Sequence, residues 1–564
     1  MRILTLRCRM KKHRRCHLFF ISFLLFSFVL AFPVQSAVEL SKTGAEYRFG
    51  QVKALPRPLR WRKLVTPHFE IFFYQGLEEL AERSARILEE DAFERVYPDF
   101  RNLFTLNPYR KIRVILFASR KEYRNSQASG LSLETTSEGV AHTLVNRLVV
   151  IGQPTYRDLR GVLTHEVTHL ITIHPFKDHL LYGSGSGVPG WIAEGLAEYY
   201  MPAETRYPIR EVALRDVVLR DKVDSLSEIS TVSGNLHYAE AWSLVDYIAR
   251  KYGREQLFAM LEAVVKEGHR DQTFQKLFGR TRLELWKDWR EELPQIYQAG
   301  AEAPPYTEET EPLFPDYRDQ SMVKIGPGGE VFFLSNCNGR LYDLFQADGD
   351  QVQNLTDRSV FAYDVAPDGR QLVFLSDDEG DRRLYRLDLV SGVETALELE
   401  VTNPIGVAWS PEGDRLVVVA NIKGDADLFL IDLEGRLLEV IADSEADETD
   451  PAWSPDGQQL AFVSPRELYD QLYLWDGKKI RMLTRTAEHH RNPVWSPTGD
   501  LYCITGQRGY YRMAAVDLEY GITTHLWPYQ ETVLEFVPTT EDFLVTLYND
   551  RRFELYRYQP GEDK

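Results

Sequence analysis

The sequence predicts a multidomain protein in which an α+β domain is followed by an all-β six-bladed propeller. Two observations predict this order. The first half carries two histidines four residues apart in a segment with helical periodicity. The second half repeats a proline-containing turn every 40 to 44 residues. A chain of 564 residues that is 44% apolar is long enough for two or three domains with their own cores.

The segment His165-Glu166-Val167-Thr168-His169 has the spacing of a metal-binding helix. Residues four apart lie on one face of a helix, so His165 and His169 can direct two imidazole nitrogens at the same ion. Glu166 then lies beside the ion, where it can act as general base toward a water that attacks a carbonyl carbon. The sequence therefore predicts a catalytic site with one Zn²⁺ per chain.

A catalytic zinc takes three protein ligands, and Glu194 is the best candidate for the third. It lies near the start of a short predicted helix between Pro189 and Pro202. Glu198 is one turn further along the same face. We expect Glu198 to hydrogen-bond the outer nitrogen of His165, and so to fix the tautomer of that ligand from outside the metal shell.

The residues around the histidines predict a helix independently. Thr155 and Asp158 form a variant of the capping box, and Pro175 ends the apolar run. The simpler alternative is a surface helix that carries two histidines and a glutamate without binding metal. The helical context and the downstream glutamate favour the metal site. The apolar positions at helical spacing are Leu159, Val162, Leu163, Val167 and Leu170.

Together with the Trp-x-x-Glu-Gly-x-Ala-x-Tyr segment at residues 191–199, the zinc motif resembles the gluzincin branch of zinc peptidases, and particularly the bacterial peptidase MA-like family. The resemblance covers roughly residues 60–298 and implies a zincin fold of the thermolysin-like type. A metzincin is excluded, because that pattern needs glycine and histidine where this chain has Thr172 and Pro175. The elements that follow the family's order are a strand entered from Thr66–Ile71, a helix over Leu77–Phe93, a strand over Lys111–Phe117 and a helix from Tyr238 to Gly253.

The resemblance also implies an activity. The Gly-x-Met-Glu-Asn segment of alanyl aminopeptidases has no counterpart here, so an endopeptidase is favoured over an aminopeptidase. Tyr238 resembles the gluzincin tyrosine whose hydroxyl stabilises the tetrahedral oxyanion. His237 is the substitute if the register differs by one residue, and the alternative for Tyr238 is ordinary packing at a helix start.

The segment Ala141–Ile151, before the zinc helix, alternates enough to predict a strand at the rim of the cleft. In gluzincins the equivalent edge strand pairs with an extended peptide, which implies broad specificity. The alternative is an interior strand paired on both sides.

The N-terminus predicts a signal peptide over residues 1–37. A basic stretch to His17 precedes the apolar run Leu18–Phe32 and the small residues of Val34–Ala37. We expect an exported, periplasmic or secreted product with no stable membrane span after cleavage; an uncleaved anchor is the alternative. A lead-in segment, residues 38–62, and the peptidase domain, residues 63–298, follow.

Charge and cysteine content narrow the function. Removal of residues 1–37 takes away seven of the 66 basic residues and none of the 84 acidic ones, which moves the formal net charge from −18 to −25. Nucleic acid is therefore excluded as a partner. Only Cys337 and Cys503 remain, on blades that are not neighbours, so we expect no disulfide.

The second half repeats a turn with proline at its second position and glycine near its end, separated by β-branched and aromatic runs. Six repeats predict six blades. The segment Asp450–Gly457 resembles the TolB-like propeller family, and this resemblance covers residues 319–564, after an acidic, Pro-rich linker over 299–318 with little to bury. The repeated prolines are Pro327, Pro367, Pro411, Pro455, Pro497 and a degenerate Pro538.

Two function classes follow. The first is an exported zinc peptidase whose propeller controls substrate access or binds an envelope protein; protein segments and peptidoglycan cross-links both fit as targets. The second is a catalytically inactive peptidase-like and propeller protein that binds a component of the cell envelope. The complete ligand set with Glu166 favours the enzyme, because a binding protein has no chemical need for a general base.

Overall fold

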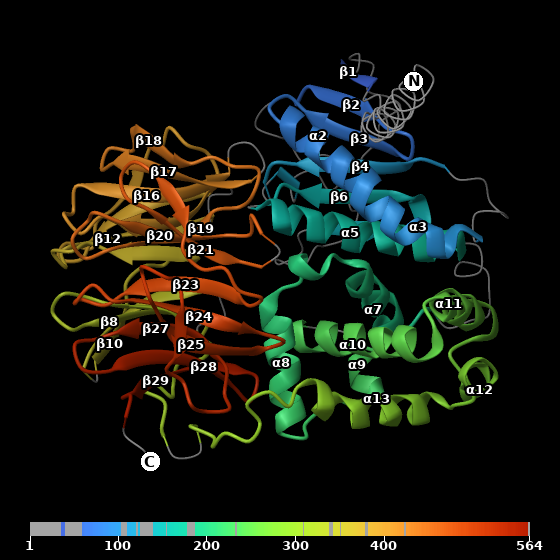
Figure 1. Cartoon of the computed structure of the whole chain (residues 1–564). Coiled ribbons are helices and arrows are strands. Elements are labelled where there is room, and N and C mark those ends of the chain that lie inside the picture. The colour runs from blue at the N-terminus through green and yellow to red at the C-terminus, as the bar shows by residue number, and fades with distance from the viewer. Residues whose placement is uncertain are drawn as a thin grey trace, which may run out of the picture.

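An α/β region with additional helices lies beside a six-bladed β-propeller in the computed structural model (Figure 1). The predicted signal sequence up to residue 34 falls outside the described residues. Within them, none of the helices is long and apolar enough to span a membrane. The described residues are 35–39, 59–102, 110–119, 122–123, 139–153, 155–176, 187–231, 234–307, 310–337, 342–349, 351–377, 382–421, 425–467 and 469–561.

The α/β region is built on a six-stranded mixed sheet with the order β1-β2-β3-β4-β6-β5. The pairs β3–β4 and β4–β6 are parallel, and the other pairs are antiparallel. This places β5 at one edge. The strands are β1 (Gln35–Glu39), β2 (Trp61–Val65), β3 (Phe69–Tyr74), β4 (Ile112–Phe117), β5 (Gly139–His142) and β6 (Arg147–Ile151).

Both faces of the central strands are covered, because apolar residues occupy successive positions and side chains alternate between faces. In β3, Ile71 and Phe73 join the main core beneath the helices, whereas Phe72 and Tyr74 join a second cluster with Phe117. The sheet is therefore a layer buried on both faces, and the helix with the two histidines packs against it.

The helices form a layer against the sheet and a separate bundle below it (Figure 1). The first layer contains α2 (Glu78–Arg86), a π-helix η1 (Ile87–Phe93), α3 (Glu94–Phe100) and α5 (Tyr156–Ile173). The bundle contains α7 (Gly190–Tyr200), α8 (Pro208–Leu219), α9 (Leu226–Ile229), α10 (Gly234–Tyr252), α11 (Glu255–Glu267), α12 (Asp271–Phe278) and α13 (Arg282–Ile296).

Three sequence-based predictions need correction here. The helix predicted over Leu77–Phe93 changes to π-helical at Ile87 and continues to Phe100, and the helix predicted to start at Tyr238 starts at Gly234. The segment Ala141–Ile151 is not one strand but the edge strand β5, a 3₁₀ turn (η3, Thr143–Val145) and the interior strand β6. The turn reverses the chain through Asn146, whose φ of 51° is tolerated by asparagine.

The propeller consists of antiparallel sheets whose strands follow one another in sequence, five with four described strands and one with three. Blade one contains β7 (Ser321–Ile325), β8 (Val331–Ser335), β9 (Asp343–Asp348) and β10 (Gln351–Asn354). Blade two contains β11 (Ala362–Val365), β12 (Gln371–Ser376), β13 (Arg383–Asp388) and β14 (Glu394–Leu397). Blade three contains β15 (Pro404–Trp409), β16 (Arg415–Asn421), β17 (Ala426–Asp432) and β18 (Leu437–Ala442). Blade four contains β19 (Thr449–Trp453), β20 (Leu460–Ser464), β21 (Gln471–Trp475) and β22 (Ile480–Met482). Blade five contains β23 (His489–Trp495), β24 (Leu501–Gln507), β25 (Tyr510–Val516) and β26 (Thr523–His525). Blade six contains β27 (Val533–Pro538), β28 (Phe543–Asn549) and β29 (Arg552–Tyr558).

The ring closes between blades six and one. The first strand of each blade neighbours the first strand of the next, and β27 neighbours β7. The chain before β7 also follows β29: Leu313 N donates to Leu555 O at 2.7 Å, and Gln320 N donates to Phe553 O at 3.0 Å. The six-bladed propeller predicted from the repeats is confirmed.

The predicted linker is anchored to the propeller, and the expectation that it has little to bury is wrong at Tyr306. This side chain is 4% exposed and packs among Trp527, Tyr529 and Tyr558. Glu531 accepts hydrogen bonds from the backbone N–H groups of Tyr306 and Thr307 at 2.9 and 3.1 Å. A single aromatic residue in a Pro-rich segment therefore fixes the connection between the two halves.

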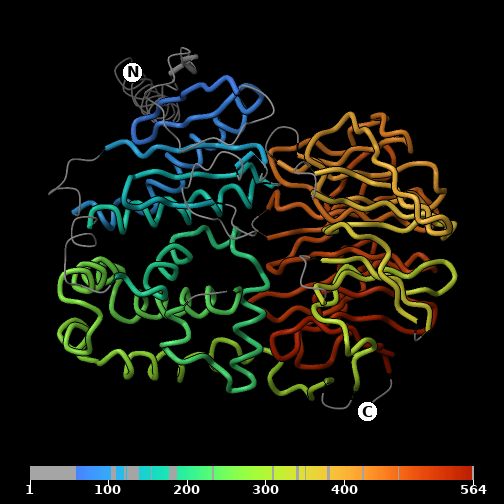
Figure 2. Tube along the Cα trace, turned by 180° about the vertical axis from the view of Figure 1, so that it is seen from behind, coloured from blue at the N-terminus to red at the C-terminus, as the bar shows by residue number. Residues whose placement is uncertain are grey.

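The two halves share one hydrophobic core, which runs from the sheet and helices into blades five and six. Helix α8 contacts β28, and Figure 2 shows from behind that the helical bundle and the propeller lie against each other. Polar contacts reinforce the junction: Arg215 Nη1 donates to Gln530 O at 2.8 Å, and Arg83 Nη2 lies 3.0 Å from Asp425 Oδ1. The thiols of Cys337 and Cys503 are both free.

Candidate active site

Helix α5 carries the two histidines, and its ends lie where the sequence predicts them. Thr155 is the N-cap: its hydroxyl accepts a hydrogen bond from Asp158 N at 3.0 Å and donates to Asp158 Oδ2 at 2.7 Å. The helix ends at Ile173, just before the 3₁₀ turn η4 (His174–Phe176), which contains Pro175. The face with Leu159, Leu163 and Val167 is buried in the main core.

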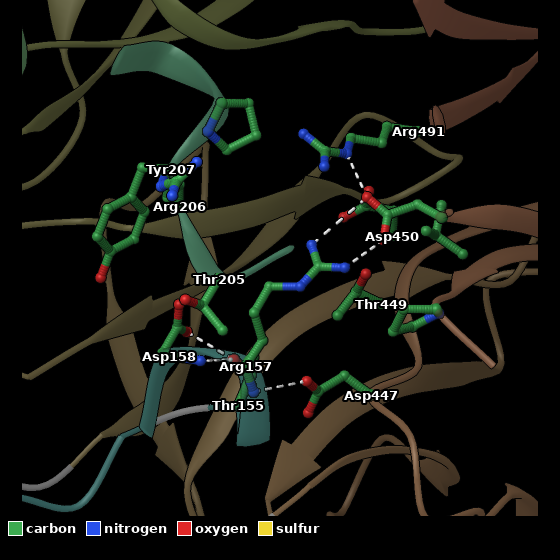
Figure 3. A pocket seen from close by; sticks show the side chains of 14 residues that line it. Thr155, Arg157, Asp158, Thr205, Arg206, Tyr207, Asp447, Thr449, Asp450 and Arg491 are labelled. Atoms are coloured by element: carbon green, nitrogen blue, oxygen red, sulfur yellow. Dashed lines mark hydrogen bonds and ion pairs between the residues drawn. The ribbon is translucent and has the colours of Figure 1, made fainter. Parts of the chain in front are cut away.

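The propeller holds the N-terminus of α5. Asp447, between β18 and β19, lies at the start of α5 beside Arg157 (Figure 3) and accepts hydrogen bonds from Tyr156 N at 2.8 Å and Arg157 N at 3.0 Å. The Arg157 side chain also pairs with Asp470. A carboxylate at a helix N-terminus accepts hydrogen bonds from N–H groups that lack a partner within the helix. Its negative charge is also attracted to the positive end of the helix dipole. The propeller therefore helps to set the position of the helix that bears the candidate metal ligands.

Helix α7 brings Glu194 to the histidines because Gly195 allows a close approach to α10. A Cβ atom at Gly195 would lie 2.5 Å from Ala241 O and 2.7 Å from Val245 Cγ2. Pro189 begins the helix, and Trp191 and Ile192 are buried in the core. The Glu-Gly pair in the second motif thus combines a candidate ligand with the residue that lets its helix pack.

His165, His169 and Glu194 converge on one point. Glu194 Oε2 lies 3.2 Å from His165 Nε2 and 3.3 Å from His169 Nε2, and the two Nε2 atoms are 3.2 Å apart. Two ligands of a tetrahedral zinc, each about 2.0–2.1 Å from the metal, are about 3.3 Å apart. All three measured separations match this value, so the described residues fit a tetrahedral metal site without rearrangement.

The surroundings of His165 favour positive charge. Burial alone would lower its pKa, but its contacts with Glu194 and Glu198 raise that pKa to about 10. Burial would raise the pKa of Glu194, but the neighbouring histidines hold it well below its usual range. The site therefore attracts a cation at the position where the three ligand atoms meet.

Glu198 lies behind His165, where helical spacing places it. Its Oε1 atom is 2.9 Å from His165 Nδ1, and the side chain is 1% exposed. The other oxygen contacts the guanidinium of Arg210, in the first turn of α8. The contact between Glu198 and His165 Nδ1 orients the imidazole so that Nε2 faces the other two ligands. Partners outside the metal shell orient metal-bound histidines in the same way.

Glu166 lies beneath the edge strand β5. A Cβ atom at Gly139 would be 3.0 Å from Glu166 Cγ and 2.9 Å from Val162 Cγ1, so the glycine lets the strand pass directly over the carboxylate. Glu166 is neighbour to His165 in the chain but is not in the three-residue cluster. It is thus free of the ligand role and lies next to the edge strand.

Tyr238 approaches the site from α10, and its ring centroid is 6.1 Å from that of His165. Burial, followed by the charge of Glu194, raises the pKa of Tyr238, so the hydroxyl stays protonated and can donate a hydrogen bond. His237 instead directs Nε2 at Asp224 Oδ2, 3.0 Å away. The geometry therefore favours Tyr238 over His237 as the candidate oxyanion donor.

Sequence reasoning missed Arg210. Its guanidinium pairs with Glu198 and lies 4.7 Å from the ring centroid of Tyr238 and 5.0 Å from that of Tyr207. The residue lies two positions after Pro208, at the start of α8, but no sequence spacing relates it to Glu198. Only the turn between α7 and α8 brings the two together.

Family models match both halves of the chain. Residues 111–295 match the Peptidase MA superfamily, and residues 329–540 match the TolB beta propeller domain. The chain thus contains a Peptidase MA superfamily domain followed by a TolB-like propeller, which confirms the resemblances read from the two motifs and from the repeats. None of the curated proteins compared matches the chain.

Solved structures that resemble the chain include two propeller proteins. The β-propeller domain of the Trilobed protease from Pyrococcus furiosus is 14% identical, with a TM-score of 0.34, over 44% of this chain and 97% of that one. TolB from Acinetobacter baumannii is 17% identical, with a TM-score of 0.30, over 50% of this chain and 72% of that one. The propeller assignment rests on the strand order and the family match rather than on these similarities.

Proposed function

We propose that this chain, a Peptidase MA superfamily domain joined to a TolB-like propeller, is an exported zinc-dependent peptidase that hydrolyses peptide bonds. The observation that carries the proposal is the convergence of His165, His169 and Glu194 at mutual distances of 3.2–3.3 Å. Two imidazole nitrogens and one carboxylate oxygen are a donor set that zinc takes in peptidases, with one position left open. Zinc bound there supplies Lewis acidity toward a carbonyl oxygen and lowers the pKa of water.

The remaining chemistry belongs to residues of the chain itself. Glu166 accepts the proton of the attacking water and passes it to the leaving amine. Tyr238 donates a hydrogen bond to the oxygen on which negative charge develops, an interaction that contributes several kcal/mol in comparable sites. Glu198, paired with Arg210, holds the His165 ring in orientation.

The edge strand β5 offers a place for substrate. It ends the sheet order, so its outer edge has no strand partner among the described residues, and it passes over Glu166. An extended peptide that pairs with this edge would bind through its backbone, whatever its side chains. This mode needs no free terminus, which supports endopeptidase action.

Backbone pairing can be tested with peptides that carry a single N-methyl group at successive positions around the cleaved bond. Loss of an N–H donor should raise KM at alternate positions, because strand hydrogen bonds alternate in direction. Equal KM for every methylated peptide would contradict pairing at β5.

Export and the role of the propeller complete the proposal. The basic and apolar N-terminal pattern supports export to the periplasm or beyond. The shared hydrophobic core and the hydrogen bond from the N-terminus of α5 to Asp447 support a propeller that is fixed to the peptidase domain. Such a fixed propeller would limit access to extended segments or bind an envelope protein partner.

Glu166→Gln tests the catalytic role. The variant should keep its zinc, because Glu166 is not a ligand, and should lose nearly all hydrolysis of a peptide library. Glu262→Gln, the same change on the solvent-facing side of α11, serves as the control and should cleave normally. Turnover by Glu166→Gln equal to that of the unmodified protein would refute the assignment. A zinc-loaded unmodified chain without hydrolysis would favour the envelope-binding alternative.

A further inference from the structure

A second cluster of possible metal ligands shares no residue with the candidate active site. Among the described residues, one ligand atom each from Asp224, His237 and Glu240 falls within 4.8 Å of the others. Asp224 lies in the segment between α8 and α9, and the other two residues lie in the first turns of α10. Because His237 and Glu240 are three apart on a helix, their side chains share one face.

Most polar atoms of the cluster have partners, but one carboxylate oxygen does not. His237 Nε2 lies 3.0 Å from Asp224 Oδ2, and Glu240 Oε1 accepts a hydrogen bond from Asp224 N at 2.9 Å. Glu240 Oε2 has no partner, although the residue is 0% exposed. A buried carboxylate oxygen without a partner is expensive and points to a missing group.

The charges of the cluster do not balance either. Two carboxylates lie close together in a buried place, and among the described residues the arginine paired with them is Arg551 of blade six, with Nη2 2.6 Å from Asp224 Oδ1. A further positive charge, either a proton or a metal ion, therefore belongs next to Glu240.

We propose that Asp224, His237 and Glu240 bind a second divalent metal ion of the zinc type, distinct from the ion of the candidate active site. One imidazole nitrogen and two carboxylate oxygens form a suitable donor set for such an ion. The ion takes the place of the proton between His237 and Asp224, and it satisfies Glu240 Oε2. Its role is structural, because both carboxylates are buried and His237 is half-buried.

The position of this site gives it a consequence for the whole chain. The Asp224 carboxylate also forms an ion pair with Arg551 of the propeller. The backbone carbonyl of Asp224 accepts a hydrogen bond from Trp286 Nε1 at 3.1 Å. The ion thus joins the start of α10 to α13 and to blade six. The same turn of α10 carries Tyr238, so the ion also fixes the helix from which the candidate oxyanion donor projects.

Zinc analysis of the full chain separates this proposal from the peptidase proposal. Unmodified protein, incubated with zinc and passed through a desalting column, should hold two equivalents. His165→Ala/His169→Ala, which removes two ligands of the candidate active site, should retain one. A double variant with no bound zinc would overturn the second site, whatever the outcome for catalysis.

Residue assignment comes from one further change on the double-variant background. Adding Glu240→Gln should remove the remaining equivalent of bound zinc, whereas adding Asp221→Asn should leave it bound. Asp221 lies three residues from Asp224, its side chain is 88% exposed, and its φ of 54° suits asparagine. Retention of zinc by the Glu240→Gln protein would overturn the assignment. If that protein fails to fold, thermal melting of the double variant decides: zinc should raise its Tm, and an unchanged Tm would overturn the proposal.

Discussion

Glu198→Gln should weaken zinc binding although Glu198 is not placed to touch the metal. The buried carboxylate lies 2.9 Å from His165 Nδ1 and also pairs with Arg210. A glutamine keeps the shape of the side chain but removes the charge that orients and polarises His165. Changes of this kind in outer partners reduce metal affinity about 10–100-fold. That range corresponds to about 1.4–2.8 kcal/mol of binding free energy.

The assay is competition for zinc between the protein and a chromophoric chelator at fixed pH. Glu89→Gln is a matched control, because Glu89 is also buried, at 5% exposure, and also contacts a histidine, with Oε2 2.7 Å from His68 Nδ1. The control should change stability without changing the zinc Kd. A Kd for Glu198→Gln within twofold of the unmodified protein, or an equal loss in Glu89→Gln, would refute the reasoning.

Three further variants test the packing of α7, the contact between the propeller and α5, and a buried carboxyl group of the propeller. Gly195→Ala should lower the free energy of unfolding in urea by about 1–3 kcal/mol, because the added Cβ would clash with Ala241 O. The control Gly187→Ala should be neutral, because its Cβ would have no atom within 4 Å. Asp447→Ala removes the acceptor of three backbone N–H groups and should lower the free energy of unfolding by about 2–4 kcal/mol; an unchanged urea midpoint would contradict the propeller's hold on α5. Burial raises the pKa of Glu535 from 4.5 to about 7, so the folded state binds this proton more tightly and stability should fall as pH rises between these values. Glu535→Gln should flatten that slope, and an unaltered slope would disprove the cause.

The predicted part of the site followed from local rules. Helical spacing alone places His165 and His169 on one face and Glu198 one turn from Glu194. The cap at Thr155 and the proline after Ile173 bound the helix correctly. These features depend on residues close in the sequence, whose relative positions the helix geometry fixes.

The missed part depends on tertiary contacts. Arg210 reaches Glu198 only because α7 and α8 turn back on each other, and Asp447 reaches α5 from nearly 300 residues away in the chain. The strand error at Ala141–Ile151 has another cause. Both β5 and β6 are apolar enough to read as a single run, and the reversal depends on the left-handed conformation of Asn146.

The most direct test of the central claim is the dependence of hydrolysis on zinc occupancy. The full chain is stripped with a chelator, reloaded in steps with zinc, and assayed on an unfolded protein by the appearance of new amino termini. We predict that cleavage is absent from the stripped chain and rises with occupancy of His165, His169 and Glu194. Cleavage that is indifferent to zinc, or a fully loaded chain that releases no new termini, would contradict the account.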